Sequence, residues 1–428
     1  MNFNKICVLG LGYIGLPTAS TFATHGLKVL GVDVNQKVVD TLRKGGLHIH
    51  EPGLRTLVSA ALGSGNLSIS DQPDNADAFI IAVPTPFKRD KKADLKYVIS
   101  AAETIVPYLR RGNLVILEST SPPRTTVDVV APILAQSGLE AGKDFYLAYS
   151  PERVLPGQII REIIENARVI GGLNQESAKA GRDLYLTFVR GEIILTSATS
   201  AEMVKLMENT YRDVNIAIAN EFSRLADKFG IDVWEAITLA NRHPRVDILH
   251  PGPGVGGHCI SVDPWFLVEA APEITPLIQA ARGVNDSQPQ YVVAIIKKAL
   301  GEIKGKKIAA LGLAYKPNVD DLRESPAITI AKLLHDEGAI VQCYEPFKKD
   351  AKIKDLKVMD SLDSAIADAD ALVLLVSHTP LVTLDPNEIA EKTNTRILID
   401  TVNGWSDEAW KAAGFRITRL GVGSGSHG

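Results

Sequence analysis

The pattern that most constrains the fold is a glycine-rich turn near the start of the chain, in the stretch VLGLGYIGLP. Gly10, Gly12 and Gly15 form G-x-G-x-x-G directly between an apolar, strand-like run and a helical pattern. The first glycine allows a tight turn, the second lets the backbone approach a pyrophosphate, and the third packs the helix against the strand. This order predicts a βαβ unit that binds a dinucleotide.

An acidic residue follows the next strand-like run. Asp33 ends LKVLGVD, where a carboxylate accepts hydrogen bonds from a ribose 2′-hydroxyl and favours NAD over NADP. FAD shares this fingerprint, and NAD is the better prediction. Thr85 and Thr120 follow the runs AFIIAVP and NLVILEST, where we expect the carboxyl ends of strands and therefore the dinucleotide. Each hydroxyl either contacts ribose or nicotinamide or serves as an ordinary turn or cap residue.

The middle of the chain differs from its two ends. Apolar runs alternate with helical patterns up to about residue 196, as in a parallel sheet covered by helices on both faces. Positions 200–228 then contain neither glycine nor proline and keep apolar residues at helical spacing, which predicts one long helix. Further helical patterns cover VWEAITLAN and about 288–300.

Strand and helix alternation resumes at KKIAALGLAY and continues through VQCYEP, ALVLLV and RILIDTV. We predict an α/β protein with two doubly wound Rossmann-like domains joined by a central helical domain with a long helix. The expected divisions are 1–196, 197–300 and 301–420, followed by a flexible tail, 421–428. The segment GLAYKP lacks the three glycines of the N-terminal turn, so we expect no second dinucleotide site.

Composition excludes several classes of partner. The 428 residues carry a formal net charge of −4, which gives no general attraction to nucleic acid or to an anionic membrane. No apolar run approaches the length of about 18 residues that a membrane span needs, and MNFNK leads directly into a strand-like run. We therefore expect a cytoplasmic protein. Three cysteines make no plausible disulfide framework.

One of these cysteines differs from the others. Cys7 and Cys343 lie inside the strand-like runs ICVLG and VQCYE and are expected in the core. Cys259 instead lies in PGPGVGGHCISVDPW, next to His258 and close to Asp263. Glycines let the backbone approach a ligand, and neighbouring charge tunes a thiol. This segment by itself favours a buried small side chain and a reactive thiol equally.

A polar stripe on the long helix offers partners for that thiol. Lys205, Asn209 and Arg212 are spaced four and three apart, so they project from one face of the helix. That face is either a polar stripe exposed to solvent or one side of a cleft. One oxidation of an alcohol needs only a base. A nucleophilic cysteine becomes useful when a thiohemiacetal loses a second hydride and gives a thioester, which water hydrolyses to an acid. Lys205 and Asp263 would then handle protons and the oxyanion.

Several further stretches carry a resemblance to a known family. GLGYIGLP, AVPTPFK, ESTSPP, YSPERVLPG, AEMVKLMEN, NRHPRVDILHPGPGVGGHCISVDPW and GLAYKPNVDDLRESPA occur in that order over nearly the whole chain. Together they resemble the UDP-glucose and UDP-N-acetylmannosamine 6-dehydrogenase family. NRHPRVDI and SPERVLPG look like the members that oxidise UDP-N-acetyl-D-mannosamine to the uronate for surface polysaccharide synthesis, using NAD.

The resemblance implies a role for each matching residue. The catalytic residues it implies are Cys259 as nucleophile, Lys205 as proton donor or acceptor, Asp263 as the residue that assists water, with Asn209 and Glu152 beside them. Besides the glycines, the NAD contacts are Tyr13, Ile14, Asp33, Thr85, Thr120 and Arg323. The UDP-sugar contacts are Arg153, Val154, Lys205, Asn209, Arg212, Gly256, Tyr315 and Lys316. No metal site is implied.

The resemblance also implies a homodimer or higher homo-oligomer. The long helix would form its core, and His243 and Arg245 would contact the substrate of a neighbouring subunit. This sequence departs from the family at Arg124 in SPPRTT, in the loop beside Thr120, where relatives commonly have glycine.

Other functions stay open at this point. A sister enzyme acting on UDP-N-acetylglucosamine or UDP-glucose differs too little to be separated by the sequence. A β-hydroxyacid dehydrogenase shares a Rossmann domain with a helical domain, but it needs neither Cys259 nor a third domain. A non-catalytic NAD-binding sensor would leave the thiol without a function.

Overall fold

The computed structural model describes residue 1, residues 3–88 and residues 90–423. Two compact units account for the chain: Met1–Glu208 with Trp265–Pro272, and Asn209–Pro264 with Glu273–Gly428. The division falls inside the long helix α8 (Ala198–Phe229). The three-domain division with limits at 196, 300 and 420 stays a prediction.

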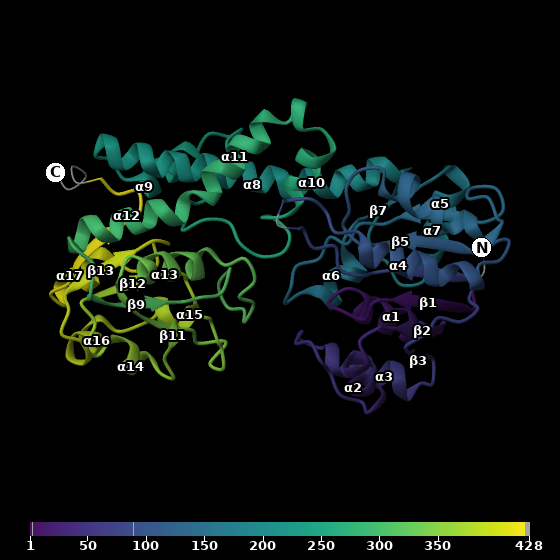
Figure 1. Ribbon diagram of the computed structural model, residues 1–428, viewed down its shortest axis with the longest axis horizontal. Coiled ribbons are helices and arrows are strands. Elements are labelled where there is room, and N and C mark those ends of the chain that lie inside the picture. Colours follow the sequence, from purple (N-terminus) through teal and green to yellow (C-terminus); the bar gives the residue numbers. More distant parts are fainter. Residues whose placement is uncertain (2, 89, 424–428) are drawn as a thin grey trace. The chain divides into compact units, whose positions relative to one another are not determined.

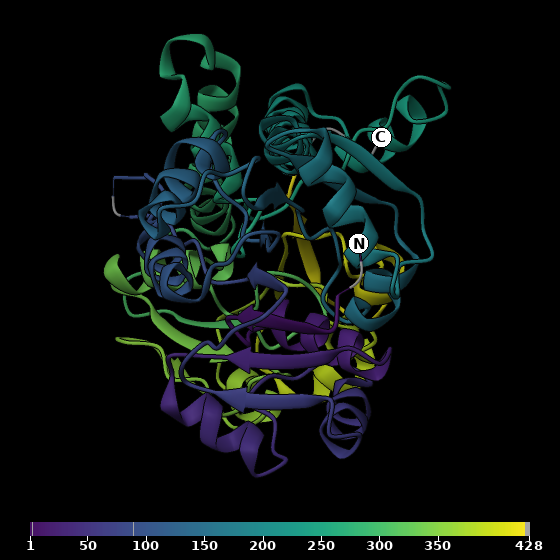
Figure 2. The same ribbon diagram turned by 90° about the vertical axis from the view of Figure 1, so that its right-hand side faces the viewer.

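The first unit contains an eight-stranded sheet. Figures 1 and 2 show its first strands, in purple and blue, side by side in one layer. The strand order is β3 (Leu67–Ser70), β2 (Lys28–Val32), β1 (Lys5–Leu9), β4 (Ala78–Ile81), β5 (Leu114–Leu117), β6 (Tyr146–Tyr149), β7 (Arg168–Gly172) and β8 (Ile193–Ser197). Its first six strands are parallel in the Rossmann order 3-2-1-4-5-6. This confirms the predicted fold class.

The sheet departs from a fully parallel arrangement at one pair. β7 runs antiparallel to β6, and β8 follows the direction of β7. The connection from Tyr149 to Arg168 carries only the short helix α6 (Ile159–Glu165). An antiparallel neighbour needs no crossover back to the starting end of the preceding strand, and most of this connection outside α6 is irregular.

Two apolar layers cover this sheet because side chains of a strand alternate between its faces. On β5, Leu114 and Ile116 join one cluster, whereas Val115 and Leu117 join the other, together with Cys7. The flanking helices are α1 (Gly15–Thr24), α2 (Gln36–Arg43), α3 (Leu54–Gly63), α4 (Lys96–Ile105), α5 (Ala131–Leu134) and α7 (Gln175–Tyr185). Cys7 has no exposed surface, so its predicted core position is confirmed, and this burial raises the pKa of its thiol to about 12.

The second unit contains a six-stranded sheet with all neighbours parallel. The order β11 (Lys357–Val358), β10 (Ile340–Tyr344), β9 (Lys307–Leu311), β12 (Ala371–Leu374), β13 (Ile397–Asp400), β14 (Arg416–Arg419) is again 3-2-1-4-5-6. Its helices are α13 (Pro326–Asp336), α14 (Leu362–Ile366), α15 (Thr379–Val382), α16 (Pro386–Lys392) and α17 (Asp407–Ala412). Cys343 is fully buried in this unit, as predicted.

The chain between the two sheets is helical, as predicted. After α8 come α9 (Val233–Ala240), α10 (Asp263–Ala270), α11 (Pro276–Asp286) and α12 (Gln288–Leu300). The irregular stretch between α9 and α10 contains Cys259. In the described part of the chain, no helix combines the length and the apolar character needed to cross a membrane. The cytoplasmic location stays a prediction.

The start of the predicted flexible tail has a defined place. The backbone N–H of Val233 donates to the carbonyl of Gly421 at 2.9 Å, and the N–H of Gly423 donates to the carbonyl of Ile231 at 3.0 Å. Asp232 and Val422 also form an antiparallel bridge. Residues 421–423 therefore pair with the segment just before α9. The rest of the predicted tail, 424–428, lies outside the described residues.

Candidate active site

The glycine turn of the first unit has the geometry that its sequence predicts. Gly10 has φ +92°, and a Cβ atom there would lie 2.5 Å from the carbonyl oxygen of Ala82. A Cβ atom on Gly15 would lie 1.8 Å from the carbonyl oxygen of Gly10. Gly12 differs, since a Cβ atom there would have no neighbour within 4 Å. The outer two glycines are therefore required by the protein itself, and Gly12 faces space that a ligand can use.

Asp33 is fixed beside this turn at the end of β2. Its Oδ2 accepts a hydrogen bond from the N–H of Leu11 at 3.0 Å, and its Oδ1 accepts one from the N–H of Asn35 at 2.8 Å. A carboxylate offers about four acceptor positions, so these two bonds orient the group and leave capacity for a ribose hydroxyl. These residues fit the adenosine end of a bound NAD.

The structure brings Thr85 and Thr120 together. The hydroxyl of Thr85 donates to the backbone carbonyl of Thr120 at 2.5 Å, which ties the loop after β4 to the loop after β5. Thr85 therefore has a structural task. Tyr13 is 37% exposed, and Ile14 precedes α1 as its N-cap residue. Contacts of these four residues with NAD stay predictions.

Gly12→Ala is expected to weaken NAD binding and leave the fold unchanged. The added methyl group meets no protein atom but enters the space where the pyrophosphate would approach. We expect the Kd for NAD to rise at least about tenfold, or ~1.4 kcal/mol, with an unchanged melting temperature. Titration calorimetry and thermal unfolding measure the two quantities. Gly63→Ala, also without a neighbour within 4 Å, is the control; equal NAD affinity in both variants would contradict this assignment.

Glu152 belongs to a buried charged cluster that the sequence analysis did not identify. Its Oε1 accepts from the N–H of Arg153 at 2.8 Å, and its Oε2 accepts from Nη2 of Arg168 at 2.8 Å. Arg168 also pairs with Glu118 at 3.3 Å and donates to the hydroxyl of Ser150 at 3.0 Å. Both oxygens of Glu152 therefore have internal partners, which favours a supporting role. Its predicted part in catalysis stays untested.

The Arg168 cluster is completed by Tyr185. The Tyr185 hydroxyl donates to Glu118 Oε1, and the Arg168 guanidinium lies 4.2 Å from the centre of the Tyr185 ring. Burial raises the pKa of Glu118 to about 7. An arginine inside the otherwise apolar strand RVIGG is the one local signal that could have revealed this cluster.

The loop after Thr120 explains the departure at Arg124. This residue has φ +73°, a left-handed conformation that favours glycine. Its N–H donates to Glu202 of α8 at 2.5 Å, and the same carboxylate accepts from the N–H of Thr126 at 2.8 Å. Glu202 is fully buried. The loop therefore has the backbone that a glycine would give, and Glu202 stabilises it.

Two predicted substrate contacts of the first unit have protein partners. Arg153 Nη2 pairs with Glu208 Oε1 at 2.5 Å, and its Nη1 donates to the carbonyl of Ala167 at 3.1 Å. Val154 packs against the apolar core. Lys205 lies in this unit on α8 and is half-buried. The substrate roles of all three stay predictions.

In the second unit, Cys259 lies one turn before Asp263. The backbone N–H of Asp263 donates to the carbonyl of Cys259 at 2.8 Å, so the cysteine joins directly onto the start of α10. Asn209 Nδ2 donates to Asp263 Oδ2 at 2.6 Å, and both side chains are buried. Cys259 is partly exposed, unlike the other two cysteines. The structure thus brings three predicted catalytic residues together.

Residues 251–262, hereafter the cysteine loop, pack closely on the segment that contains Tyr315. A Cβ atom on Gly257 would lie 2.7 Å from the Tyr315 ring, and one on Gly256 would lie 2.5 Å from the carbonyl oxygen of Glu324. Only glycine fits at these two positions. Burial, and then the charge of Asp321, raises the pKa of Tyr315 to about 12. Tyr315 therefore stays a neutral hydrogen-bond donor near physiological pH.

Arg323 also lies against the cysteine loop. Its carbonyl accepts from the N–H of Gly257 at 3.1 Å, and its guanidinium contacts His258 Nδ1 at 3.2 Å. Asp321 accepts from the same guanidinium at 2.7 Å. Burial would raise the pKa of Asp321, but Arg323 holds it below its usual value. The NAD contact of Arg323 stays a prediction. Asp321 was not identified from the sequence, and His258 was identified only as the neighbour of Cys259.

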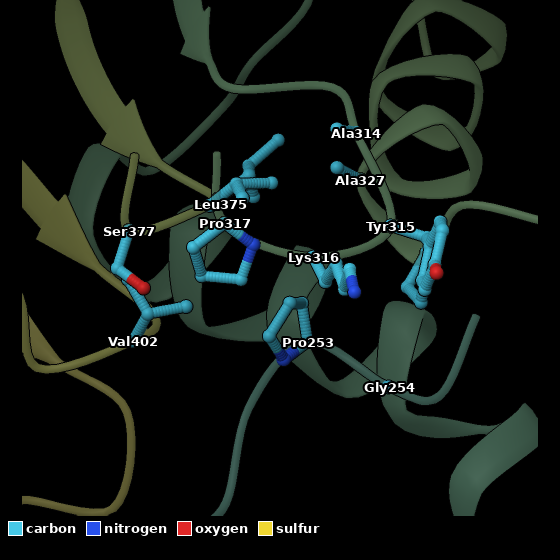
Figure 3. A pocket seen from close by; sticks show the side chains of 12 residues that line it. Pro253, Gly254, Ala314, Tyr315, Lys316, Pro317, Ala327, Leu375, Ser377 and Val402 are labelled. Carbon is cyan, nitrogen blue, oxygen red and sulfur yellow. The ribbon is translucent and has the colours of Figure 1, made fainter. Parts of the chain in front are cut away.

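A small cavity of about 90 Å³ opens beside this segment. Figure 3 shows Tyr315, Lys316 and Pro317 next to one another along its wall. Pro253 and Gly254 contribute from the cysteine loop, as do residues after β12 and β13. Two predicted substrate contacts, Tyr315 and Lys316, therefore line one cavity of the second unit.

The remaining predicted substrate contacts are exposed. Arg212 lies on an exposed face of α8, and His243 and Arg245 lie in an exposed turn after α9. The N–H of Arg245 donates to His243 Nδ1 at 3.3 Å. Among the described residues, no group of three or more His, Cys, Asp or Glu side chains is placed to hold a metal ion.

Comparison with known proteins identifies the family. Residues 4–189 match the NAD binding domain of the UDP-glucose/GDP-mannose dehydrogenase family, residues 199–287 its central domain, and residues 309–407 its UDP binding domain. The glycine turn and Asp33 lie in the first match, Cys259 in the second, and the cavity-lining Tyr315 and Lys316 in the third. The predicted cofactor, NAD, is thereby confirmed.

Individual relatives match over almost the whole chain. The UDP-N-acetyl-D-mannosamine dehydrogenase of Methanocaldococcus jannaschii is 50% identical over 98% of this chain and 97% of its own. The NDP-N-acetyl-D-galactosaminuronic acid dehydrogenase of Ralstonia solanacearum is 48% identical over 95% of this chain and 97% of its own. The structure of a UDP-D-ManNAc dehydrogenase from Pyrococcus horikoshii has a TM-score of 0.91 at 41% identity, covering 97% of this chain and 99% of its own. The chain therefore belongs to the UDP-glucose/GDP-mannose dehydrogenase family, as an NAD-dependent enzyme that oxidises a nucleotide sugar.

Proposed function

We propose that this enzyme oxidises UDP-N-acetyl-D-mannosamine to UDP-N-acetyl-D-mannosaminuronate, with reduction of two NAD molecules, for surface polysaccharide synthesis. The observation that carries the four-electron reaction is the partly exposed Cys259, bonded through its backbone to Asp263, whose carboxylate is held by Asn209. The choice of sugar is supported by the 50% identity with the Methanocaldococcus enzyme.

The proposed chemistry assigns one task to each residue. The glycine turn at 10–15 and Asp33 would hold NAD, which when bound would supply the hydride acceptor for each of the two oxidations. Lys205 takes the proton of the C6 alcohol in the first oxidation. The Cys259 thiolate then bonds to the carbonyl carbon of the aldehyde, and this thiohemiacetal is oxidised to a thioester. Water breaks the C–S bond, releasing the carboxylate and the thiol, and Asp263 accepts the proton of the water.

Asn209 supports this assignment by its contact with Asp263. The amide donates to Asp263 Oδ2 at 2.6 Å in a buried setting. An amide N–H can only donate, so the Asp263 oxygen is the acceptor in this bond. The bond also fixes the direction in which the carboxylate points.

The sugar specificity is tested by comparing substrates. We expect the highest initial kcat/KM with UDP-N-acetylmannosamine, ahead of UDP-N-acetylglucosamine, UDP-N-acetylgalactosamine and UDP-glucose, and two NADH formed per sugar. The Ralstonia relative, at 48% identity, makes the galactosamine sugar the second candidate. A preference for any of the other three sugars would overturn the substrate assignment. One NADH per sugar would instead indicate a single-step dehydrogenase.

An apolar stripe on α8 supports the predicted homodimer. Within the second unit, five large apolar side chains of α8 are at least 40% exposed: Tyr211, Ile218, Phe222, Leu225 and Phe229. The spacings of seven, four, three and four place them on one face of the helix. An exposed apolar stripe of this kind is typical of an interface, and we propose that a second copy of the chain covers it.

Phe222→Asp is expected to convert the dimer into a monomer, because the interface would have to bury an unpaired charge. Sedimentation velocity measures the mass. Activity should fall with the mass, since His243 and Arg245 are proposed to contact the neighbouring subunit's substrate. Leu277→Asp changes an exposed leucine of α11 outside the stripe and is the control. An unchanged mass for Phe222→Asp would refute this interface.

A further inference from the structure

The first turn of the second sheet keeps part of the dinucleotide turn. Gly312 has φ +87°, and its N–H donates to the carbonyl of Tyr344 at 2.9 Å. Gly10 makes the equivalent bond to Val32 at 2.8 Å in the first sheet. In both sheets the first strand therefore turns over the end of the second through the same glycine conformation.

The acidic residue after the second strand is also kept, with a different task. Glu345 follows β10 as Asp33 follows β2. Its Oε2 accepts from the N–H groups of Leu313 and Ala314 at 2.7 and 2.9 Å, and its Oε1 accepts from the N–H of Phe347 at 3.0 Å. Only 1% of Glu345 is exposed. The carboxylate therefore binds the protein's own backbone and has no surface left for a ribose.

A buried histidine completes this arrangement. His378 Nδ1 accepts from the backbone N–H of Asn318 at 2.9 Å, and its Nε2 lies 3.1 Å from Glu345 Oε2. A backbone N–H can only donate, so Nδ1 is the acceptor, and Nε2 carries the hydrogen that Glu345 receives. His378 has no exposed surface. This pair is hereafter the Glu345–His378 clamp.

The clamp holds both ends of one loop. Glu345 binds the N–H groups at the start of the loop, and His378 binds the N–H of Asn318 at its end. Asn318 has φ +60°, and its side chain is fixed by Thr379 through bonds of 2.9 and 3.0 Å. Between these anchors lie Tyr315 and Lys316, which line the cavity in Figure 3.

Charge also ties the pair together. Burial would raise the pKa of Glu345, but hydrogen bonds from His378 and from the N–H groups of Phe347 and Leu313 lower it below its usual value. An ionised carboxylate in a core costs desolvation energy that packing alone would avoid. Its presence indicates a need for a defined loop geometry rather than for stability alone.

We propose that the Glu345–His378 clamp is a positioning device that sets the 314–317 loop for the uridine diphosphate part of the substrate. The inference rests on the proposed function, because it takes Tyr315 and Lys316 as contacts of the nucleotide sugar. Neither Glu345 nor His378 touches the substrate; both act through the loop.

Two replacements of His378 separate positioning from packing. The amide of His378→Gln reaches the Nε2 position, so it keeps the bond to Glu345 and loses the acceptor for Asn318. The amide of His378→Asn occupies the Nδ1 position, so it keeps that acceptor and loses Glu345. His378→Asn removes more buried volume than His378→Gln, so a packing effect alone would be larger in His378→Asn. Asn318→Gly is the third variant, since this exposed residue already has a φ that glycine tolerates, and the change removes both bonds to Thr379.

The probe is UDP, titrated by calorimetry, with NAD titrated in parallel and steady-state rates measured on UDP-N-acetylmannosamine. We expect His378→Gln and Asn318→Gly to raise the Kd for UDP and the KM for the sugar nucleotide at least about tenfold, with kcat and NAD affinity unchanged. His378→Asn should change UDP affinity less. Unchanged UDP affinity in Asn318→Gly, or equal losses of UDP and NAD affinity in both His378 variants, would overturn the inference. Failure of the wild-type enzyme to bind UDP would instead refute the proposed function.

Discussion

Cys259→Ser is expected to abolish formation of the sugar acid. A serine hydroxyl is far less acidic than a thiol, so it does not capture the aldehyde as a stable adduct for the second oxidation. We expect the rate of acid formation to fall at least about 1,000-fold, or ~4 kcal/mol in the barrier. NADH formation measured by absorbance and acid formation measured by chromatography give this rate and its stoichiometry. Affinity for NAD and for UDP should stay unchanged, because neither binding site is altered.

Cys343→Ala is the matched control for this experiment. Cys343 lies in the same unit but is fully buried, and burial raises the pKa of its thiol to about 12. Its sulfur has no exposed surface that could meet a substrate, so its replacement should leave the rate within about twofold. Two NADH per sugar at the wild-type rate from Cys259→Ser would refute the thioester mechanism.

Arg168→Met is expected to destabilise the first unit strongly. The change leaves Glu118 and Glu152 in a buried setting without their shared cation. Removing one partner of a buried ion pair costs about 3–5 kcal/mol. Thermal and urea unfolding of the full chain should therefore show an early transition that the wild-type protein lacks, with loss of NAD binding. A melting profile identical to that of the wild type would contradict this account of the cluster.

The same cluster predicts a pH dependence with a defined sign. Burial raises the pKa of Glu118 from 4.5 to about 7. The folded state binds this proton more tightly than the unfolded chain, so the stabilisation is complete below pH 4.5 and is lost as the pH rises through 7. Glu118→Gln stays neutral and accepts the same bond from Tyr185. We expect it to raise the melting temperature at pH 8 and to flatten the decline between pH 5 and 8, whereas Glu176→Gln on the surface should do neither.

Secondary structure was predictable from the sequence where the local pattern is strong. The helical pattern at about 288–300 corresponds to α12 (Gln288–Leu300), and the long helix predicted at 200–228 extends by only a few residues in α8 (Ala198–Phe229). The direction of β7 was not predictable in this way. Its apolar residues fit either direction, and residues 150–167 with α6 are long enough for a parallel crossover as well. Only the observed pairing with β6 shows the antiparallel direction.

The candidate site was predictable where its chemically reactive residues are close together in the chain. Cys259 and Asp263 are close in the sequence, and the structure joins them by a backbone hydrogen bond. The partners of Glu152 were not predictable, because Glu118 and Arg168 come from different strands. The task of Glu345 was equally hidden, since a carboxylate after a second strand usually indicates a ribose contact.

The sequence by itself determined the glycine turn, the NAD preference and the family, and it singled out Cys259 as the candidate nucleophile, because each depends on residues adjacent in the chain or at fixed spacing. Only the tertiary structure decided which polar side chains serve the fold and which face a ligand. Asp33 and Glu345 occupy equivalent positions, yet a buried histidine on a distant strand connection gives Glu345 a partner that Asp33 lacks in its described hydrogen bonds. Burial and partner choice depend on residues far apart in the chain, and so no local pattern records them.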